Sequence, residues 1–168
     1  MAYRVADLQP GDTILVRGGG KSLPARALDA AIRWSTGSSY THAVLVGDGV
    51  LIEALEKVTL SPLDKYAAIG DRFEVEICPY SGHPSARAIE WAKAHVGAPY
   101  GVREILLDAA RFDLHWLPHV RRPLRHLTCS GLVAMAYAQS GITLTYAPWP
   151  APSDLSYSPL LIGTRAHL

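Results

Sequence analysis

The sequence predicts an α+β fold, because segments with strand-like alternation and segments with helical spacing both occur along its 168 residues. Two β-rich runs surround the pair Asp48-Gly49, which predicts a β-hairpin over 42–54. Both faces of this hairpin are largely apolar, so we expect it inside a sheet. Apolar residues at helical spacing follow Thr128, which predicts an amphipathic helix. With 49% hydrophobic residues the chain can bury a core, and one domain over 1–168 is predicted.

The other regular elements are predicted from turn residues and periodicity. Strands are expected at 11–17 and 72–77, and helices at 22–35, 81–96 and 102–112. A triple glycine separates the first of these strands from the first helix. It lacks the spacing of a phosphate-binding P-loop, so we interpret it as a plain loop.

Three segments carry weaker signals. The stretch 57–71 is largely uninformative, although 61–66 suits a short helical turn. The stretch 114–126 is basic, broken by prolines and apolar in patches, which is typical of a loop or lid. A short final turn is expected at 153–155, with Ser153 or Asp154 as its N-cap.

Charge and targeting signals exclude some partners. Sixteen basic and fifteen acidic side chains leave a net charge of +1, which gives no argument for nucleic acid or an anionic membrane. No segment approaches the roughly 20 apolar residues of a membrane span, and the first ten residues do not resemble a signal peptide. A cytoplasmic location is expected, with export by another route as the alternative. In a reducing compartment Cys78 and Cys129 are expected to remain thiols.

Cys129 is predicted to lie in the first turn of its helix and to point inward. Apolar residues follow it at the spacing of one buried helical face: Leu132, Val133, Ala136 and Tyr137. At a helix start, backbone N–H groups and the positive end of the helix dipole favour a thiolate, the form of cysteine that attacks carbonyls. The alternative is that Cys129 is a small buried apolar residue.

His42 and Glu53 are predicted to share one face of the hairpin. If Asp48-Gly49 forms a two-residue turn, Val44 lies opposite Glu53 and His42 lies diagonal to it. Such a pair can be a buried hydrogen bond with a structural role only. Alternatively, the carboxylate fixes the tautomer and orientation of a general base that serves Cys129. We favour the second interpretation because a candidate nucleophile is present.

A metal site is not predicted. His115, His119 and His126 lie close together in the sequence, and a histidine pair at i and i+4 can bind zinc on a helix. However, Pro118 interrupts the first pair, and no cysteine or acidic ligand is interleaved. The sequence therefore predicts neither a metal nor another cofactor.

Two motifs resemble a known family. The run 97–100 (GAPY), followed by 128–133 (TCSGLV) and 141–142 (GI), resembles the nucleophile region of the NlpC-type, papain-like cell-wall peptidases. The run 41–49 (THAVLVGDG) with 52–54 (IEA) resembles their histidine hairpin. In the ordinary family the cysteine precedes the histidine, whereas here the order is reversed. This reversed order resembles the order of the two residues in the circularly permuted branch of the family, which comprises the YiiX-like and lecithin retinol acyltransferase-like proteins.

The resemblance spans nearly the whole chain, because Gly11-Asp12 and 158–160 (SPL) also look YiiX-like. It implies a circularly permuted papain-like α+β fold, with a central antiparallel sheet packed against helices. It also implies that His42 is the base, Glu53 the orienting residue and Cys129 the nucleophile. The glycine pair that ordinarily follows the Pro-Tyr element is replaced here by Gly101-Val102-Arg103, which leads into the lid-like segment, so the resemblance does not define the substrate groove.

The resemblance implies a cysteine-nucleophile hydrolase or acyltransferase that acts on an amide or ester bond through an acyl-enzyme. A peptide, a peptidoglycan fragment or an acyl-lipid is the expected substrate. The backbone N–H of Cys129 is the expected oxyanion donor, and Tyr40 or Tyr100 is a candidate second donor. Ordinary packing is the alternative role for either tyrosine. The alternative to an enzyme is a catalytically silent binding module of the same fold.

Overall fold

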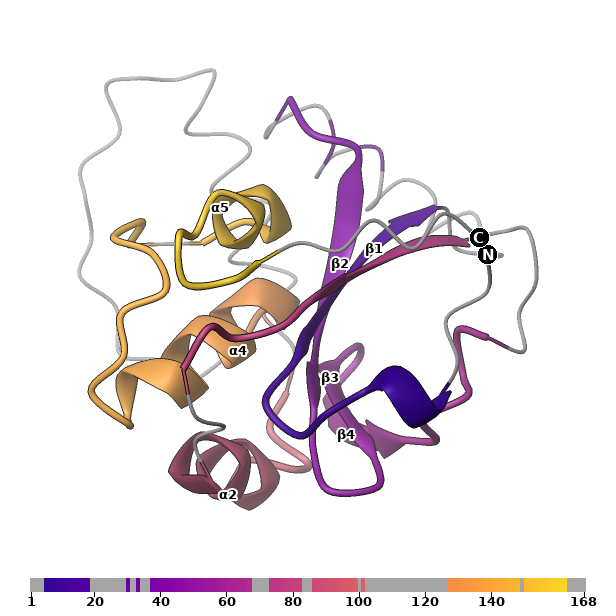
Figure 1. Ribbon diagram of the computed structural model, residues 1–168, viewed down its shortest axis with the longest axis vertical. Helices are drawn as coiled ribbons and strands as arrows, with labels where there is room; N and C mark the ends of the chain where they lie inside the picture. Colours follow the sequence, from indigo (N-terminus) through magenta and orange to yellow (C-terminus); the bar gives the residue numbers. More distant parts are fainter. Residues whose placement is uncertain are drawn as a thin grey trace.

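A five-stranded antiparallel sheet carries three helices on one of its faces in the described part of the chain (Figure 1). The computed structural model describes residues 5–18, 30, 33, 37–67, 73–82, 86–99, 101, 127–148 and 150–162. The predicted helix at 102–112 and the predicted lid at 114–126 lie outside these ranges, as does nearly all of the predicted helix at 22–35. The described elements establish the α+β class that the sequence predicts.

The strand order in the sheet is β4-β3-β2-β1-β5, and each neighbouring pair is antiparallel. The strands are β1 (Thr13–Gly18), β2 (Tyr40–Val46), β3 (Leu51–Ala54), β4 (Val58–Ser61) and β5 (Phe73–Cys78). The predicted strands at 11–17 and 72–77 are therefore confirmed as β1 and β5. Strand β4 was not predicted, because it is an edge strand of four residues, and one short alternation of Val58 and Leu60 with polar residues does not distinguish a strand from a loop.

The hairpin of β2 and β3 has the predicted register. Val46 pairs with Leu51 and Leu45 with Ile52, and the Gly47 N–H donates to the Val50 carbonyl at 2.8 Å. Gly49 has a φ of 71°, the left-handed conformation that glycine adopts without a steric penalty. This register places His42 and Glu53 on one face and brings them diagonally together.

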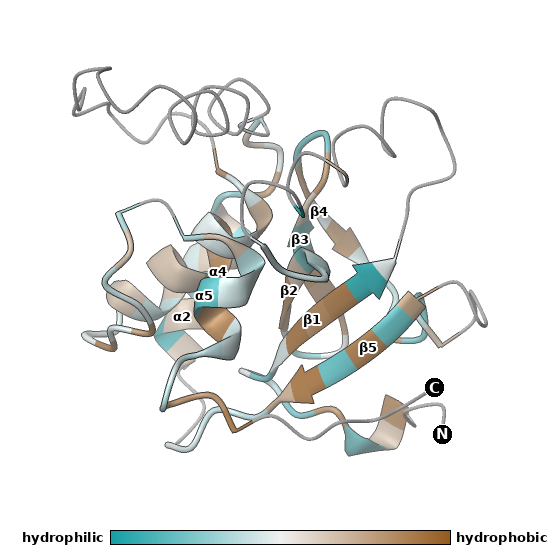
Figure 2. Cartoon of the chain, turned by 90° about the horizontal axis from the view of Figure 1, so that it is seen from above, coloured by the Kyte–Doolittle hydropathy of each residue, from teal (hydrophilic) through white to brown (hydrophobic). Residues whose placement is uncertain are grey.

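The helices are α2 (Ala86–Ala94), α4 (Cys129–Ala138) and α5 (Pro152–Ser156), and Figure 2 shows all three on one side of the sheet. The prediction for α5 needs a correction, because its N-cap is Ala151 and neither Ser153 nor Asp154 occupies that position. Asp154 instead reaches back, and its Oδ2 accepts from the Ala151 N–H at 2.7 Å. An acidic side chain in the first turn can satisfy the start of a helix in this way.

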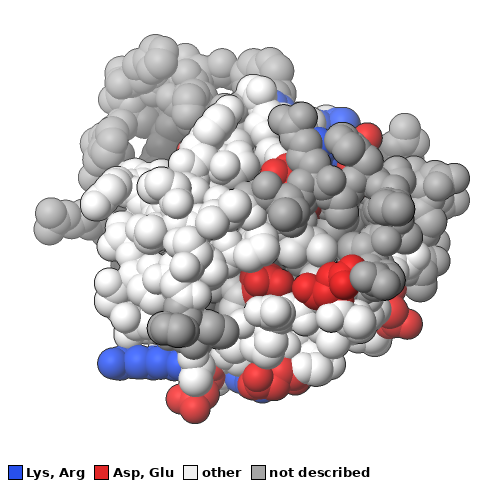
Figure 3. Space-filling model, viewed as in Figure 1, with Lys and Arg blue, Asp and Glu red and all other residues white. Residues whose placement is uncertain are grey.

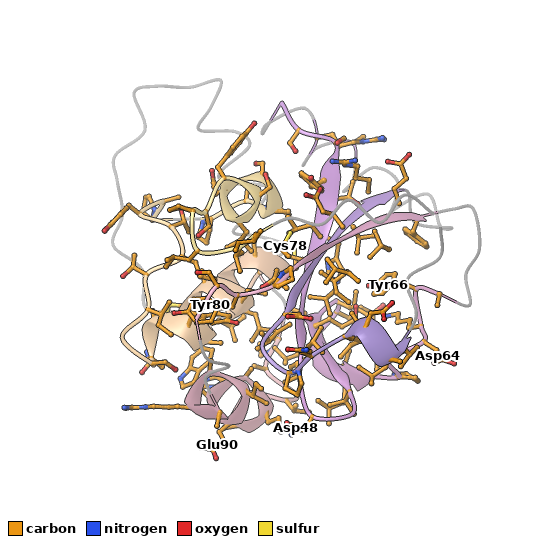
Figure 4. All side chains as sticks on the ribbon, in the orientation of Figure 1. Asp48, Asp64, Tyr66, Cys78, Tyr80 and Glu90 are labelled. Atoms are coloured by element: carbon orange, nitrogen blue, oxygen red, sulfur yellow. The ribbon has the colours of Figure 1, made fainter. Side chains whose placement is uncertain are left out.

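The sheet separates two apolar clusters. On the helix side, alternate strand residues such as Leu15, Leu45 and Ile52 pack with α2 and α4. On the other side, residues such as Ile14, Val44 and Leu51 pack with Tyr66 from the turn after β4. Figure 4 accordingly shows Cys78 and Tyr66 on opposite sides of the strands. Both faces are buried, which explains why the hairpin strands read as almost continuously apolar.

On the side shown in Figure 3, acidic side chains gather near the centre and basic side chains are few and separate. Within the described segments, no helix combines the length and apolar character that crossing a membrane requires.

Candidate active site

Cys129 is the first residue of α4, as the sequence predicts. Thr128 is the N-cap in an extended conformation, and its side-chain oxygen accepts from the Gly131 N–H at 3.0 Å. Cys129 is 2% exposed. The predicted helical face is buried throughout and comprises Leu132, Val133, Ala136 and Tyr137.

Helix α4 is anchored at both ends. At its far end, the Tyr137 hydroxyl donates to the Gly11 carbonyl at the start of β1, and its ring packs against Tyr80 with 5.1 Å between centroids. At its near end, the Ser130 hydroxyl donates to the Pro150 carbonyl. These contacts fix the position of the Cys129 thiol relative to the sheet.

His42 on β2 joins the other two predicted site residues. Its Nε2 lies 3.1 Å from Oε2 of Glu53, and its ring also forms a hydrogen bond with the Cys129 side chain. Because Glu53 occupies Nε2, Nδ1 is the ring nitrogen that remains for the thiol. The structure therefore places Cys129, His42 and Glu53 in one connected chain of interactions.

The electrostatic environment favours the imidazolium form of His42. Burial lowers the pKa of His42, but the hydrogen bond and charge interaction with Cys129, followed by those with Glu53, outweigh burial and raise the pKa to about 9. The same attraction favours the thiolate form of Cys129. An imidazolium beside a thiolate is the reactive arrangement of a thiol nucleophile.

Glu53 on β3 is a fully buried carboxylate with a partner on each oxygen. Its Oε2 accepts from the Tyr66 hydroxyl at 2.7 Å as well as facing His42, and its Oε1 accepts from Lys65 Nζ. Burial raises the pKa of Glu53, but the hydrogen bond and charge of His42 and the hydrogen bonds of Lys65 and Ser61 hold it well below its ordinary value. Glu53 is therefore an anion near neutral pH.

Lys65 and Tyr66 were not anticipated as site residues. They lie in the turn at 63–67, directly after the unpredicted strand β4, which pairs with β3 so that Glu53 lies opposite Thr59. Recognising β4 would have brought this turn back toward Glu53. The lysine and tyrosine at 65–66 would then have been candidate partners for a buried carboxylate.

The hydroxyl of Tyr40, one of the two candidate oxyanion donors, is hydrogen bonded to side chains of β1 and β5. The β1–β2 register shifts between Val16 and Arg17, so Tyr40 lies on the helix side of the sheet whereas His42 pairs with Val16. The Tyr40 hydroxyl donates to Glu76 and accepts from Arg17 at 2.6 Å. Burial and the Glu76 carboxylate raise the pKa of Tyr40 to about 12.

The second candidate oxyanion donor, Tyr100, lies outside the described residues, although its neighbours on both sides are described. The Gly101 N–H donates to the Leu127 carbonyl at 3.2 Å, and the Leu127 N–H donates to the Pro99 carbonyl at 3.4 Å. Pro99 and Gly101 are therefore hydrogen bonded to Leu127, which precedes Cys129 by two residues. The chain on either side of Tyr100 thus lies beside the start of α4.

These features define an α+β protein in which a cysteine, a histidine and a glutamate are linked by direct contacts. The crystal structure of metalloprotein yiiX from Escherichia coli O157:H7, a DUF1105 protein, has a TM-score of 0.65 to this chain. The match covers 93% of this chain and 96% of that chain at 18% sequence identity. No protein-family model matches the sequence, and no curated protein matches it. The likeness to yiiX therefore shows the fold.

Proposed function

We propose that the chain is a thiol hydrolase or acyltransferase with a circularly permuted, papain-like site of the NlpC type. The observation that supports this most directly is the connected set of Cys129, His42 and Glu53. A thiol at a helix start, an imidazole in contact with it and a carboxylate on the second ring nitrogen are the parts of a nucleophile, base and orienting residue.

In the proposed reaction, the Cys129 thiolate attacks the carbonyl carbon of an amide or ester. The His42 imidazolium then donates its proton to the leaving amine or alcohol, and a thioester acyl-enzyme remains. Water or an acceptor amine or alcohol next attacks the thioester while His42 accepts its proton. The thiolate leaves, and His42 returns to the imidazolium form. Glu53 keeps Nε2 protonated throughout, so that Nδ1 exchanges the proton.

The developing oxyanion needs hydrogen-bond donors near the thiol. We assign this role to the Cys129 backbone N–H, because the first N–H groups of a helix point along its axis and the positive end of the helix dipole lies there. Tyr100 stays a candidate for the second donor. Tyr40 would first have to release its hydrogen bond to Glu76.

The proposed substrate is a peptide or peptidoglycan amide, or an acyl-lipid. These classes share a carbonyl next to a nitrogen or oxygen leaving group, which is all that the three site residues require. An acyl-lipid would also need an apolar channel next to Cys129, whereas a peptide would need polar groups for its backbone.

The yiiX protein is described as a metalloprotein, which raises the question whether the site residues of this chain suit a metal. Both oxygens of Glu53 are already hydrogen bonded, and the Lys65 ammonium on Oε1 would repel a cation. Both ring nitrogens of His42 face partners as well. Across the described ranges, no group of three or more His, Cys, Asp or Glu could hold a metal ion. The described site does not fit a metal, and no step is assigned to one.

Selective alkylation tests the proposal. At pH 6, iodoacetamide should label Cys129 and leave Cys78 unlabelled, because burial and the nearby charges of Glu76 and Asp12 raise the pKa of Cys78 to about 12. Cys129→Ala should abolish the labelling, and the matched variant Cys78→Ala should keep it. Both sites can be read by peptide mass spectrometry.

Turnover is tested by incubating wild type, Cys129→Ala and Cys78→Ala with muropeptide and lipid extracts. Products should form with wild type and Cys78→Ala and be absent with Cys129→Ala. Equal products from Cys129→Ala and wild type would refute the assigned nucleophile. Labelling of Cys129 without turnover of either extract would favour the catalytically silent binding module.

A further inference from the structure

Lys65 forms an ion pair with Glu53, although the proposed reaction assigns no role to Lys65. Its Nζ donates to Oε1 of Glu53, the oxygen on the side of the carboxylate away from His42, and lies 3.5 Å from the Ser61 hydroxyl. Glu53 is 0% exposed, whereas the Lys65 side chain is 25% exposed. A fully buried carboxylate thus stands between two groups that can both be cations, Lys65 and His42.

The turn that carries Lys65 is firmly held. The neighbouring Tyr66 is 4% exposed, donates to Oε2 of Glu53 and packs edge to face on Phe73 of β5, with 5.8 Å between ring centroids. Lys65 Nζ also lies 5.3 Å from the centroid of the Tyr66 ring. The ammonium therefore has a defined place, unlike most surface lysines.

We propose that Lys65 is a positioning residue that acts through Glu53, and that its charge sets the pH range in which His42 carries the proton for catalysis. This inference rests on the proposed function, because it concerns the base of the same thiol site. The positive charge of Lys65, held on Oε1 of Glu53, opposes the imidazolium, which makes the His42 proton easier to transfer to a leaving group.

The groups around His42 support an effect of this direction. Glu53 on β3 and Cys129 on α4 face the His42 ring. Lys65 and Tyr66, in the turn at 63–67, lie behind Glu53. The apolar Val16 on β1 pairs with His42. Among these described neighbours, Lys65 is the cation. Removing its charge leaves two groups that stabilise the imidazolium when ionised, Glu53 and Cys129, without an opposing one.

The alternative is that Lys65 is only a structural partner for a buried charge. The two roles predict opposite shifts. If Lys65 only holds the carboxylate in place, its loss lets Glu53 rotate away from His42, and the imidazolium becomes harder to form. If its charge opposes the imidazolium, its loss makes the imidazolium easier to form and moves the His42 titration to higher pH.

The experiment is an NMR titration of the His42 imidazole in wild type, Lys65→Met, Lys65→Gln and Lys65→Arg, with the signal assigned by its absence in His42→Gln. We expect Lys65→Met and Lys65→Gln to raise the titration midpoint by about one pH unit. Lys65→Arg, which keeps the charge, should stay within a few tenths of a unit of wild type. Lys65→Gln keeps a donor for Oε1, so it provides the answer if Lys65→Met does not fold.

An unchanged or lowered midpoint in the neutral variants, or an equal rise in Lys65→Arg, would overturn the proposal. This result is separate from the fate of the proposed function. Wild-type Cys129 that resists alkylation at pH 6 would refute the thiol site itself. Reactive wild-type Cys129 together with an unshifted midpoint in both neutral variants would refute only the role of Lys65.

Discussion

His42 Nε2 and Glu53 Oε2 lie 3.1 Å apart as a diagonal pair on one face of the β2–β3 hairpin. Glu53 has no exposed surface, and the His42 side chain is 14% exposed. In such a site charges are weakly screened, so each partner strongly affects the ionisation of the other. The reactivity of Cys129 should therefore depend on Glu53, because the two residues are linked through the His42 imidazole.

Glu53→Gln should slow the alkylation of Cys129 at pH 6 by about 10-fold or more, because the neutral amide no longer stabilises the imidazolium that favours the thiolate. The side chain keeps nearly the same shape, so the effect is mainly electrostatic. The rate is measured by quenching with excess thiol and quantifying the Cys129 peptide by mass spectrometry.

The matched control is Glu56→Gln, two residues beyond β3 on an exposed position. It makes the same chemical change and should leave the alkylation rate within about twofold of wild type, as is usual for surface substitutions. Equal rates for Glu53→Gln and wild type would show that the carboxylate plays no part in activating the thiol.

Glu53 should also contribute to the loss of stability in acid. Its pKa is lowered in the folded state, since hydrogen bonds and the charge of His42 outweigh burial. A group of this kind stabilises the fold above its ordinary pKa of 4.5, and this contribution is lost as the pH falls below that value. Wild type should therefore lose more unfolding free energy than Glu53→Gln between pH 5 and pH 3.

Urea unfolding at a series of pH values measures this difference. The other carboxyl groups are common to both proteins, so their contributions cancel when the two curves are subtracted. Parallel curves would mean that Glu53 has the same pKa in the folded and unfolded chains. That result would contradict the buried ion pairs of Glu53 with His42 and Lys65.

His42 should titrate near pH 9 in wild type and at lower pH in Cys129→Ala. Burial disfavours its charge, and the hydrogen bond and charge of Cys129 come first among the interactions that favour it. Without the thiol, burial is opposed by Glu53 alone, so the NMR titration midpoint should fall. Cys78→Ala, the control for loss of a buried thiol elsewhere, should leave the midpoint in place.

The sequence predicted the parts of the site that depend on local pattern. Thr128 and the helical spacing after it predicted the start of α4, and Asp48-Gly49 predicted the register that brings His42 to Glu53. Both predictions follow from helical periodicity and turn chemistry within about 15 residues, a range over which few backbone conformations fit the pattern. The assignment of β1 and β5 succeeded for the same reason.

The missed features depend on contacts between distant or weakly patterned segments. Strand β4 has four residues, too few to be recognised alone, and without it Lys65 and Tyr66 could not be placed behind Glu53. The shift in register at Thr41 moves Tyr40 to the other face of the sheet, and no feature of the sequence marks an extra residue there. The N-cap of α5 was misplaced because Asp154 caps from within the first turn.

The start of α4 offers a test in which two substitutions should depend on each other. Gly131 is helical, and replacing a helical glycine with alanine ordinarily stabilises a protein by about 0.5–1 kcal/mol. Here a Cβ at Gly131 would lie 2.7 Å from Thr128 Oγ1, the oxygen that caps the helix. Gly131→Ala should therefore displace the capping hydroxyl and destabilise the wild-type protein or fail to stabilise it.

In the Thr128→Ala background the obstacle is gone. Thr128→Ala alone should cost about 1 kcal/mol through loss of the cap, and adding Gly131→Ala should then restore about 0.5–1 kcal/mol. Thr128→Ser is the matched control, because it keeps the oxygen and hence the conflict with the new methyl group. Urea unfolding of the single and double variants gives the coupling energy. If Gly131→Ala stabilises the protein equally in all three backgrounds, Thr128 does not cap the helix that presents Cys129.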